Sequence, residues 1–344
     1  MISLYCEQVV DLDDPAMVWA VVDCDGFLVD PDLLRYRIRS IGTEGLEEVL
    51  EWTDVDLEAD RISLGRFVCN WEVPADADTE VFYRLEAEWV EGGRTRKAYK
   101  TFEVLPYDLG LDGTHFCFMK DLLDEGIMTD EDDLNRYAKL IKSVSSQIRK
   151  ITRRNFATEY KTLKLDAMSS SSIVALSESI IGVEKVRFPE YFETNQDETT
   201  FEVYARHLSQ NLLQPDDRDY PHLKFHGGLL GVVQERQPAK FRAGPQGVEI
   251  VGLFGYTDPD GSCDGETPDD IRRVCIAMVN RESPVISDTD ERESRMDRGF
   301  ITHESTHSQS YTKDAQGVSK GVTGDRWIDN TLARYTLSFT IGVL

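Results

Sequence analysis

The sequence predicts an α+β protein in which a β-rich N-terminal part precedes a small helical bundle that carries a β insertion. Apolar and polar residues alternate strictly in two segments before residue 105, as they do in half-buried strands. Two amphipathic helices with clear start and stop signals follow, the first near 129–154 and the second from residue 267 onward. Strand-like sequence lies between them. A length of 344 residues accommodates two domains, or three if the insertion is counted.

Residues 1–105 are predicted to form a β-sandwich of immunoglobulin-like size. Residues 35–39 and 83–89 alternate apolar and polar side chains, which places one face of each strand in a core and the other in water. Residues 91–94, Glu-Gly-Gly-Arg, predict a tight turn into a partner strand near 97–104. The tryptophans of this part are expected in its core and not at a ligand site: Trp19, Trp52, Trp71 and Trp89.

Residues 106–118 are the expected linker, because Pro, Gly and Asp are frequent there. The helical bundle then spans residues 119–335. In its long helix, over 129–154, apolar residues recur every three or four positions and form one stripe. Thr129 is the expected N-cap, and Asp132 stands at the capping-box position. A basic run at the other end of this helix complements the helix dipole.

The second helix is expected to begin with Thr267 as its N-cap and Pro268 at its first position, where the missing N–H has no cost. A β insertion covers about residues 157–256, between the two helices. Its strands are expected at 158–165, 173–176, 180–188, 201–205 and 248–256. A short amphipathic helix and an apolar tail, residues 336–344, end the chain.

The charge and hydropathy of the chain exclude two classes of function. Lys and Arg number 38 against 63 Asp and Glu, for a net charge of −25. Tight binding along a nucleic-acid backbone depends on an excess of Lys and Arg, so we expect none. No apolar run reaches the roughly 18 residues that a membrane span needs, and the first residues lack the basic and apolar regions of a signal peptide. We therefore expect a soluble protein that is made in the cytoplasm and has no membrane contact.

The cysteines and an acidic loop give no cofactor site. The six cysteines are scattered without any Cys-x-x-Cys spacing, so neither a zinc ribbon nor a redox pair is indicated, and buried free thiols are expected. Residues 258–266 resemble a calcium-binding loop. However, Cys263 stands where an EF-hand needs glycine, and Asp269 stands where it needs glutamate. We therefore predict no cofactor.

One catalytic pattern is complete. His303, Glu304 and His307 match H-E-x-x-H, which on a helix presents two zinc ligands and a general base. The alternative function is therefore a zinc metalloprotease. Hydroxyl residues around the pattern favour a strand, turn or loop over a helix, and no G-x-x-H continuation supplies a third ligand. We therefore favour a protein that is not an enzyme, with a generic soluble binding module as a further alternative.

Four stretches of the second part of the chain resemble a known family. They are 120–127 leading into the long helix; 148–156 followed by 162–166; 255–257 before 268–273; and 310–312 followed by 321–329. In order and spacing they resemble the head-to-tail connector (adaptor) proteins of tailed bacteriophages, over roughly residues 118–344. The compact members of that family begin near the position of Met119, so residues 1–105 are additional.

The resemblance implies a structural subunit of the virion neck. Such adaptors form a ring, expected here to be a dodecamer, beneath the portal protein, and a neck, stopper or tail-terminator protein lies on the tail side. The ring extends the channel for double-stranded DNA, and the acidic charge would repel the passing duplex. Residues 1–105 would decorate its outer face. The C-terminal segment would dock into the portal through Trp327, Ile328, Leu332, Tyr335, Leu337, Phe339, Ile341 and Leu344.

Overall fold

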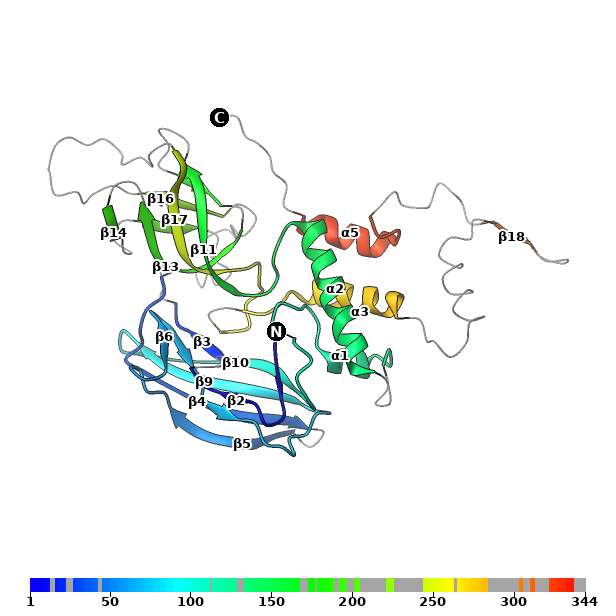
Figure 1. Cartoon of the computed structure of the whole chain (residues 1–344), viewed down its shortest axis with the longest axis horizontal. Coiled ribbons are helices and arrows are strands. Elements are labelled where there is room, and N and C mark those ends of the chain that lie inside the picture. Colours follow the sequence, from blue (N-terminus) through cyan, green and yellow to red (C-terminus); the bar gives the residue numbers. More distant parts are fainter. Residues whose placement is uncertain are drawn as a thin grey trace.

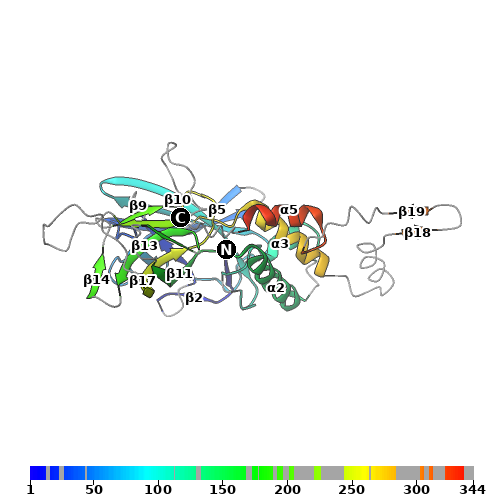
Figure 2. The same cartoon turned by 90° about the horizontal axis from the view of Figure 1, so that it is seen from above.

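The computed structural model describes residues 1–12, 16–22, 27–42, 45–111, 113–128, 133–167, 173–176, 178–188, 192–196, 201–204, 221–225, 244–262, 265–283, 303–305, 310–312 and 322–336. Within these ranges the chain has several sheets and few helices, which confirms the predicted α+β class (Figure 1). Figure 2 shows from above that α2, α3 and α5 lie on one side of the larger sheets. None of the described helices has the length and hydropathy needed to cross a lipid bilayer.

The N-terminal part is built on a five-stranded sheet with the strand order β1-β10-β9-β4-β5. Its strands are β1 (Ile2–Tyr5), β4 (Leu33–Gly42), β5 (Gly45–Asp54), β9 (Phe82–Glu91) and β10 (Arg94–Leu105). The first strand pairs with β10 in parallel, and the other pairs are antiparallel. The predicted hairpin is confirmed: Gly92 and Gly93 join β9 to β10 with φ of 55° and 75°, which suits a primed turn.

Smaller sheets face this one. They comprise β2 (Val9–Val10) with β8 (Trp71–Glu72), and β3 (Val18–Ala20) with β7 (Arg66–Val68) and β6 (Arg61–Ser63). Trp19 of β3 and Trp89 of β9 are buried with their rings 5.7 Å apart, so one core joins the sheets. Trp71 is buried there as predicted. The expectation for Trp52 is wrong, because its ring lies on the outer face under the guanidinium groups of Arg35 and Arg37.

The β insertion contains two sheets. One has the order β11-β17-β13-β14, with β11 (Glu159–Ala167), β13 (Ile180–Phe188), β14 (Phe192–Gln196) and β17 (Gly244–Phe254). The other has the order β12-β16-β15, with β12 (Ile173–Ala175), β15 (Phe201–Tyr204) and β16 (His222–Phe225). All five predicted strands are present, whereas β14 and β16 were not expected.

The insertion packs directly on the N-terminal part. Ile181 of β13 and Leu253 of β17 are buried in the core of the N-terminal sheets. The backbone N–H of Leu28 donates to the carbonyl oxygen of Val183 at 2.8 Å. Phe27, in turn, is buried within the core of the insertion. Each β unit therefore buries side chains in the core of the other.

The described helices are α1 (Met119–Asp124), α2 (Leu134–Thr152), α3 (Asp269–Glu282) and α5 (Arg326–Tyr335). Helices α2, α3 and α5 touch one another and share one apolar core. Its fully or almost fully buried members include Ile141, Val144, Ile148, Ile271, Val274, Ile328 and Leu332. Two short strands, β18 (His303–Ser305) and β19 (Ser310–Thr312), pair with each other in the segment before α5.

Both predicted helix starts are wrong. Helix α2 begins at Leu134, because the Asp133 carboxylate accepts hydrogen bonds from the N–H groups of residues 135 and 136. Thr129 and Asp132 lie outside the described residues. Helix α3 begins one residue later than expected, after Pro268. The hydroxyl of Thr267 instead donates to the carbonyl oxygen of Phe156 at 3.0 Å, which ties the start of α3 to the residues that follow α2.

The predicted linker is part of the core. In the described residues between 106 and 118 the chain forms neither helix nor strand. Leu111, Phe116, Cys117 and Phe118 are nevertheless buried, and Phe116 meets Phe156 edge to face with ring centroids 5.5 Å apart. The segment therefore holds the sheet and the helices together instead of separating them.

The close approach of β13 and β17 generates a prediction. A Cβ atom at Gly252 would lie 2.2 Å from the carbonyl oxygen of Gly182, so a side chain there forces the strands apart. We expect Gly252→Ala to lower the free energy of unfolding by about 2–3 kcal/mol, measured by urea denaturation. Gly42→Ala is the matched control, because no atom comes closer than 4.0 Å to its Cβ. Equal losses in the two variants would contradict the packing described.

Candidate functional site

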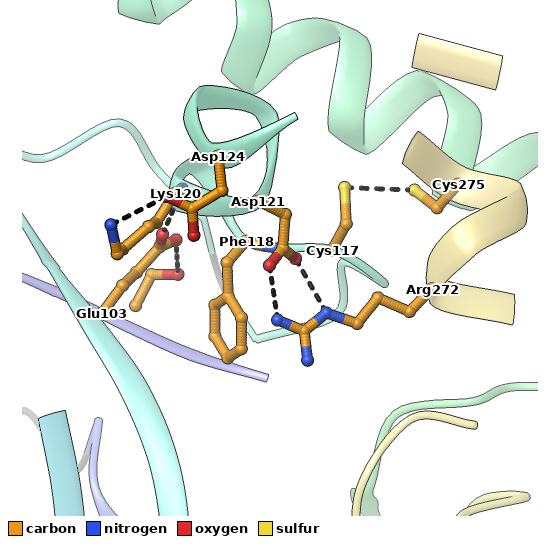
Figure 3. Close-up of polar contacts among 9 residues, drawn as sticks. Glu103, Cys117, Phe118, Lys120, Asp121, Asp124, Arg272 and Cys275 are labelled. Atoms are coloured by element: carbon orange, nitrogen blue, oxygen red, sulfur yellow. Dashed lines mark hydrogen bonds and ion pairs between the residues drawn. The ribbon is translucent and has the colours of Figure 1, made fainter. Parts of the chain in front are cut away.

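Polar side chains from four distant segments meet where α1 lies against the end of the five-stranded sheet (Figure 3). We call this the buried polar junction and define it by its members, Ser3, Glu103, His115, Asp121 and Arg272. Glu103 and His115 are almost fully buried, at 2% and 1% exposure. Because an isolated buried charge is unfavourable, the partners of each group decide what the junction can do.

Glu103 links β10 to the start of α1. Its carboxylate accepts a hydrogen bond from the hydroxyl of Ser3 at 2.7 Å. It accepts another from the backbone N–H of Lys120 at 3.1 Å (Figure 3). The N–H groups in the first turn of a helix have no intrahelical partner, so this carboxylate provides the acceptor for one of them. Burial nevertheless raises the pKa of Glu103 to about 7, because desolvation outweighs these hydrogen bonds.

Ser3, Glu103 and His115 form a chain of polar groups. The Oγ atom of Ser3 lies 3.1 Å from Nε2 of His115 as well as 2.7 Å from the Glu103 carboxylate. In a serine hydrolase the histidine lies between the serine and the acid, whereas here the serine hydroxyl is in the middle. The Ser3 hydroxyl donates its proton to the Glu103 carboxylate and is not aligned by a His-acid pair, so this order does not activate Ser3 as a nucleophile.

Asp121 and Arg272 join α1 to α3. The Nε atom of Arg272 donates to Oδ2 of Asp121 at 2.9 Å, and its Nη2 atom donates to Oδ1, so the pair is bidentate (Figure 3). Oδ2 also accepts the backbone N–H of Phe118 at 2.8 Å. The guanidinium lies 5.1 Å from the Phe118 ring centroid, in cation–π range. The ion pair itself joins residues that lie 151 positions apart in the sequence.

A cavity of about 940 Å³ lies beside the junction, and Ser3, Phe118 and Arg272 are among the residues that line it. Its wall includes carboxylates as well as cations, among them Asp260 and Glu266. Burial, followed by the charges of Asp260 and Asp269, raises the pKa of Glu266. With charges of both signs on its wall, the cavity does not define the charge of a ligand.

The sequence did not reveal the junction. Ser3 and Glu103 are direct partners in the parallel pairing of β1 with β10, a pairing between the first and last strands of the N-terminal part. One signal was present in the sequence, because Glu103 interrupts the apolar run of residues 102–105. A carboxylate at such a position indicates either an exposed face or a buried partner.

The predicted docking residues divide into four groups. The expectation for Ile328 and Leu332 is corrected, because both are buried in the chain's own helical core and present no surface to a partner. Tyr335 packs edge to face on Phe156 with centroids 5.6 Å apart. Trp327 is exposed, at 49%. The remaining residues, Leu337, Phe339, Ile341 and Leu344, lie outside the described part of the chain.

The H-E-x-x-H pattern does not lie on a helix where it is described. His303 and Glu304 belong to β18, where they pair with Thr312 and Tyr311 of β19. His307 lies outside the described residues. A zinc protease needs both histidines on one helical face, so the strand removes the premise of that alternative. In the described ranges no group of three or more His, Cys, Asp or Glu side chains could hold a metal ion.

Comparison of the chain with protein-family models, with curated proteins and with solved structures found no match. The contacts of the junction therefore define its role. The junction provides a hydrogen-bond acceptor for the first turn of α1, fixes α3 against α1 and contains a titratable carboxyl group. These properties are those of a structural contact between elements.

The Asp121–Arg272 pair yields a prediction. Asp121→Asn leaves the Arg272 charge partly buried without its partner, so we expect a loss of about 2–3 kcal/mol in the free energy of unfolding. Asp124→Asn is the matched control on the same helix, since Asp124 pairs with Lys120 while its side chain is 55% exposed. That change should cost less than about 0.5 kcal/mol in urea denaturation. A similar loss in both variants would mean that the bidentate pair contributes no more to stability than the exposed pair of Lys120 and Asp124.

Glu103 predicts a pH dependence of stability. Its pKa in the folded protein, about 7, lies above the ordinary value of 4.5, so the folded state binds the proton more tightly than the unfolded state. The resulting stabilisation is complete below pH 4.5 and is lost as the pH rises through 7. Glu103→Gln stays neutral, so its stability relative to wild type should increase between pH 5 and pH 8, by on the order of 3 kcal/mol at most.

Urea denaturation of both proteins at several pH values measures this difference, in which the contributions of other titrating groups cancel. Glu88→Gln is a control of opposite sign. Hydrogen bonding to Lys97, followed by that to Arg35, lowers the pKa of Glu88 against the effect of burial. The wild type should therefore be the more stable protein near neutral pH, and the difference should vanish as the pH falls through the lowered pKa. A pH-independent difference for Glu103→Gln would exclude titration at the junction.

Proposed function

We propose that this chain is a head-to-tail connector subunit of a tailed bacteriophage, which works as part of a ring and carries out no catalysis. The observation that carries the proposal is the arrangement of α2, the β insertion, α3 and α5. Helices α2 and α3 pack together although the whole insertion separates them in sequence. This helix-insertion-helix order is what the four family-like stretches imply.

The N-terminal part fits an attached domain of such a subunit. We propose that residues 1–105 form a β-sandwich. The contact between the indole side chains of Trp19 and Trp89, which come from different sheets, supports this assignment. Its fixed attachment also matters, because Glu103 binds the first turn of α1. A decoration domain held in this way would keep one orientation on each subunit of a ring.

The charge of the chain suits a DNA channel. A dodecamer with a net charge of −25 per subunit would carry on the order of 300 negative charges. The field of such a ring repels the phosphate backbone of duplex DNA, and this repulsion prevents adhesion during packaging and ejection. The protein would then border the path of the DNA without binding it tightly.

Contact with the portal would come from the surface around α5 and from the tail that follows it. Trp327 is 49% exposed and Val322 is 79% exposed, and both lie in the segment that leads into the C-terminal residues. Isolated apolar side chains are common on surfaces, but a tryptophan at half exposure is a frequent anchor of protein interfaces. We assign the contact to Trp327 together with Leu337, Phe339, Ile341 and Leu344.

Mass measurement of native assemblies tests the proposal. The chain, alone or mixed with its portal and tail-side neck proteins, should give a closed ring, expected to be a dodecamer. Deleting residues 337–344 and changing Trp327→Ala should each reduce portal binding at least about tenfold, while circular dichroism stays unchanged. Tyr99→Ala, on the exposed face of β10, is the matched control and should bind as the wild type does. A chain that stays monomeric in every mixture would exclude the ring.

A further inference from the structure

Two cysteine thiols touch in the core that joins the linker to the helices. The Sγ atom of Cys275 in α3 lies 3.4 Å from Sγ of Cys117, which precedes α1 (Figure 3). Both side chains are completely buried, and 158 residues separate them in sequence. The scattered spacing of the cysteines gave no sign of this pair. Cys6 and Cys69, the other cysteines within the described residues, belong to the core of the N-terminal sheets.

The surroundings keep the two thiols facing each other. Ser145 of α2 lies 3.7 Å from Cys275 Sγ, and its Oγ atom accepts the backbone N–H of Phe116 at 3.1 Å. Three segments, α2, α3 and the residues before α1, are therefore fixed around the sulfur atoms. A disulfide bond measures about 2.0 Å, so the two sulfur atoms have to approach by only about 1.4 Å to form one.

The same contacts make the resting Cys117 thiol unreactive. The hydrogen bond with Cys275, followed by burial, raises the pKa of the Cys117 thiol well above its ordinary value. The thiolate is the form that attacks a disulfide, so the closed core resists oxidation. Local opening that admits water and an oxidant would make the thiols accessible to oxidation.

We propose that Cys117 and Cys275 are an oxidation site, a pair of thiols that a small-molecule disulfide converts into a disulfide bond. One cysteine thiolate attacks the small disulfide, forms a mixed disulfide and releases one small thiolate. The second cysteine thiolate then displaces the remaining small group and completes the bond. In sum, the two protein thiols lose two electrons and two protons, and the small disulfide is reduced to two thiols.

The bond would tie the residues before α1 to α3 and close a loop that contains the whole β insertion. A cross-link that closes so long a loop restricts the unfolded chain strongly, so the oxidised protein should unfold at a temperature roughly 5–10 °C higher. This site is independent of the connector proposal, because it depends only on the packing of the two thiols.

Peptide mapping of the wild-type chain tests the inference without relying on any variant. The folded protein is incubated with oxidised glutathione, its remaining thiols are alkylated, and the digest is analysed without reduction. We expect one cross-linked peptide pair that contains residues 117 and 275, which dithiothreitol releases. Urea below the unfolding transition should accelerate its formation several-fold, because opening exposes the thiols. Absence of this pair after prolonged incubation in such urea would overturn the proposal, as would equal yields of other cysteine pairs.

Thermal unfolding supplies the second readout. Oxidation should raise the midpoint for the wild type and for Cys6→Ser, whose sulfur lies in another core. It should leave the midpoint unchanged for Cys117→Ser and Cys275→Ser. If either serine variant fails to fold, the cross-linked peptide of the wild type still decides the question. A shift that persists in both folded serine variants would assign the stabilisation to a different pair.

Discussion

The bidentate ion pair of Asp121 and Arg272 is the contact that fixes α1 against α3, and the N-terminal sheet is in turn attached to α1. Apolar packing among α2, α3 and α5 is strong but has no preferred direction. A guanidinium that meets a carboxylate through two hydrogen bonds fixes both distance and angle. Because Asp121 also accepts the backbone N–H of Phe118, one side chain sets the start of α1 and the position of α3 together. The N-terminal sheet follows, since Glu103 is bound to the same short helix.

Local sequence predicted the elements well and their ends less well. The apolar stripe of α2 and the alternation in β9 depend on residues a few positions apart, so periodicity reveals them. The start of α2 was misplaced because Thr129, Asp130, Asp132 and Asp133 are all residues that can cap a helix, and the local sequence does not say that Asp133 is the one that does. Thr267 was misassigned for a related reason. Its hydroxyl has a partner more than a hundred residues away, in Phe156.

Sequence patterns did not predict the buried polar junction. Ser3, Glu103 and His115 come together through a parallel strand pairing and a buried connection, neither of which has a local signature. Helix α5 shows the converse limit. Its amphipathic pattern predicted correctly that Ile328 and Leu332 face an apolar surface, but a pattern does not say whether that surface belongs to the same chain. The structure places both in the core of the chain itself.

The parallel pairing of β1 with β10 has a consequence for the order of events during synthesis. The first strand of the chain finds its neighbour only among residues 102–105, so it leaves the ribosome long before its partner exists. At about 5–20 residues per second, that interval is on the order of 5–20 s. Residues 2–5 have no strand partner throughout it, and their pairing with β10 adds an edge strand to the sheet.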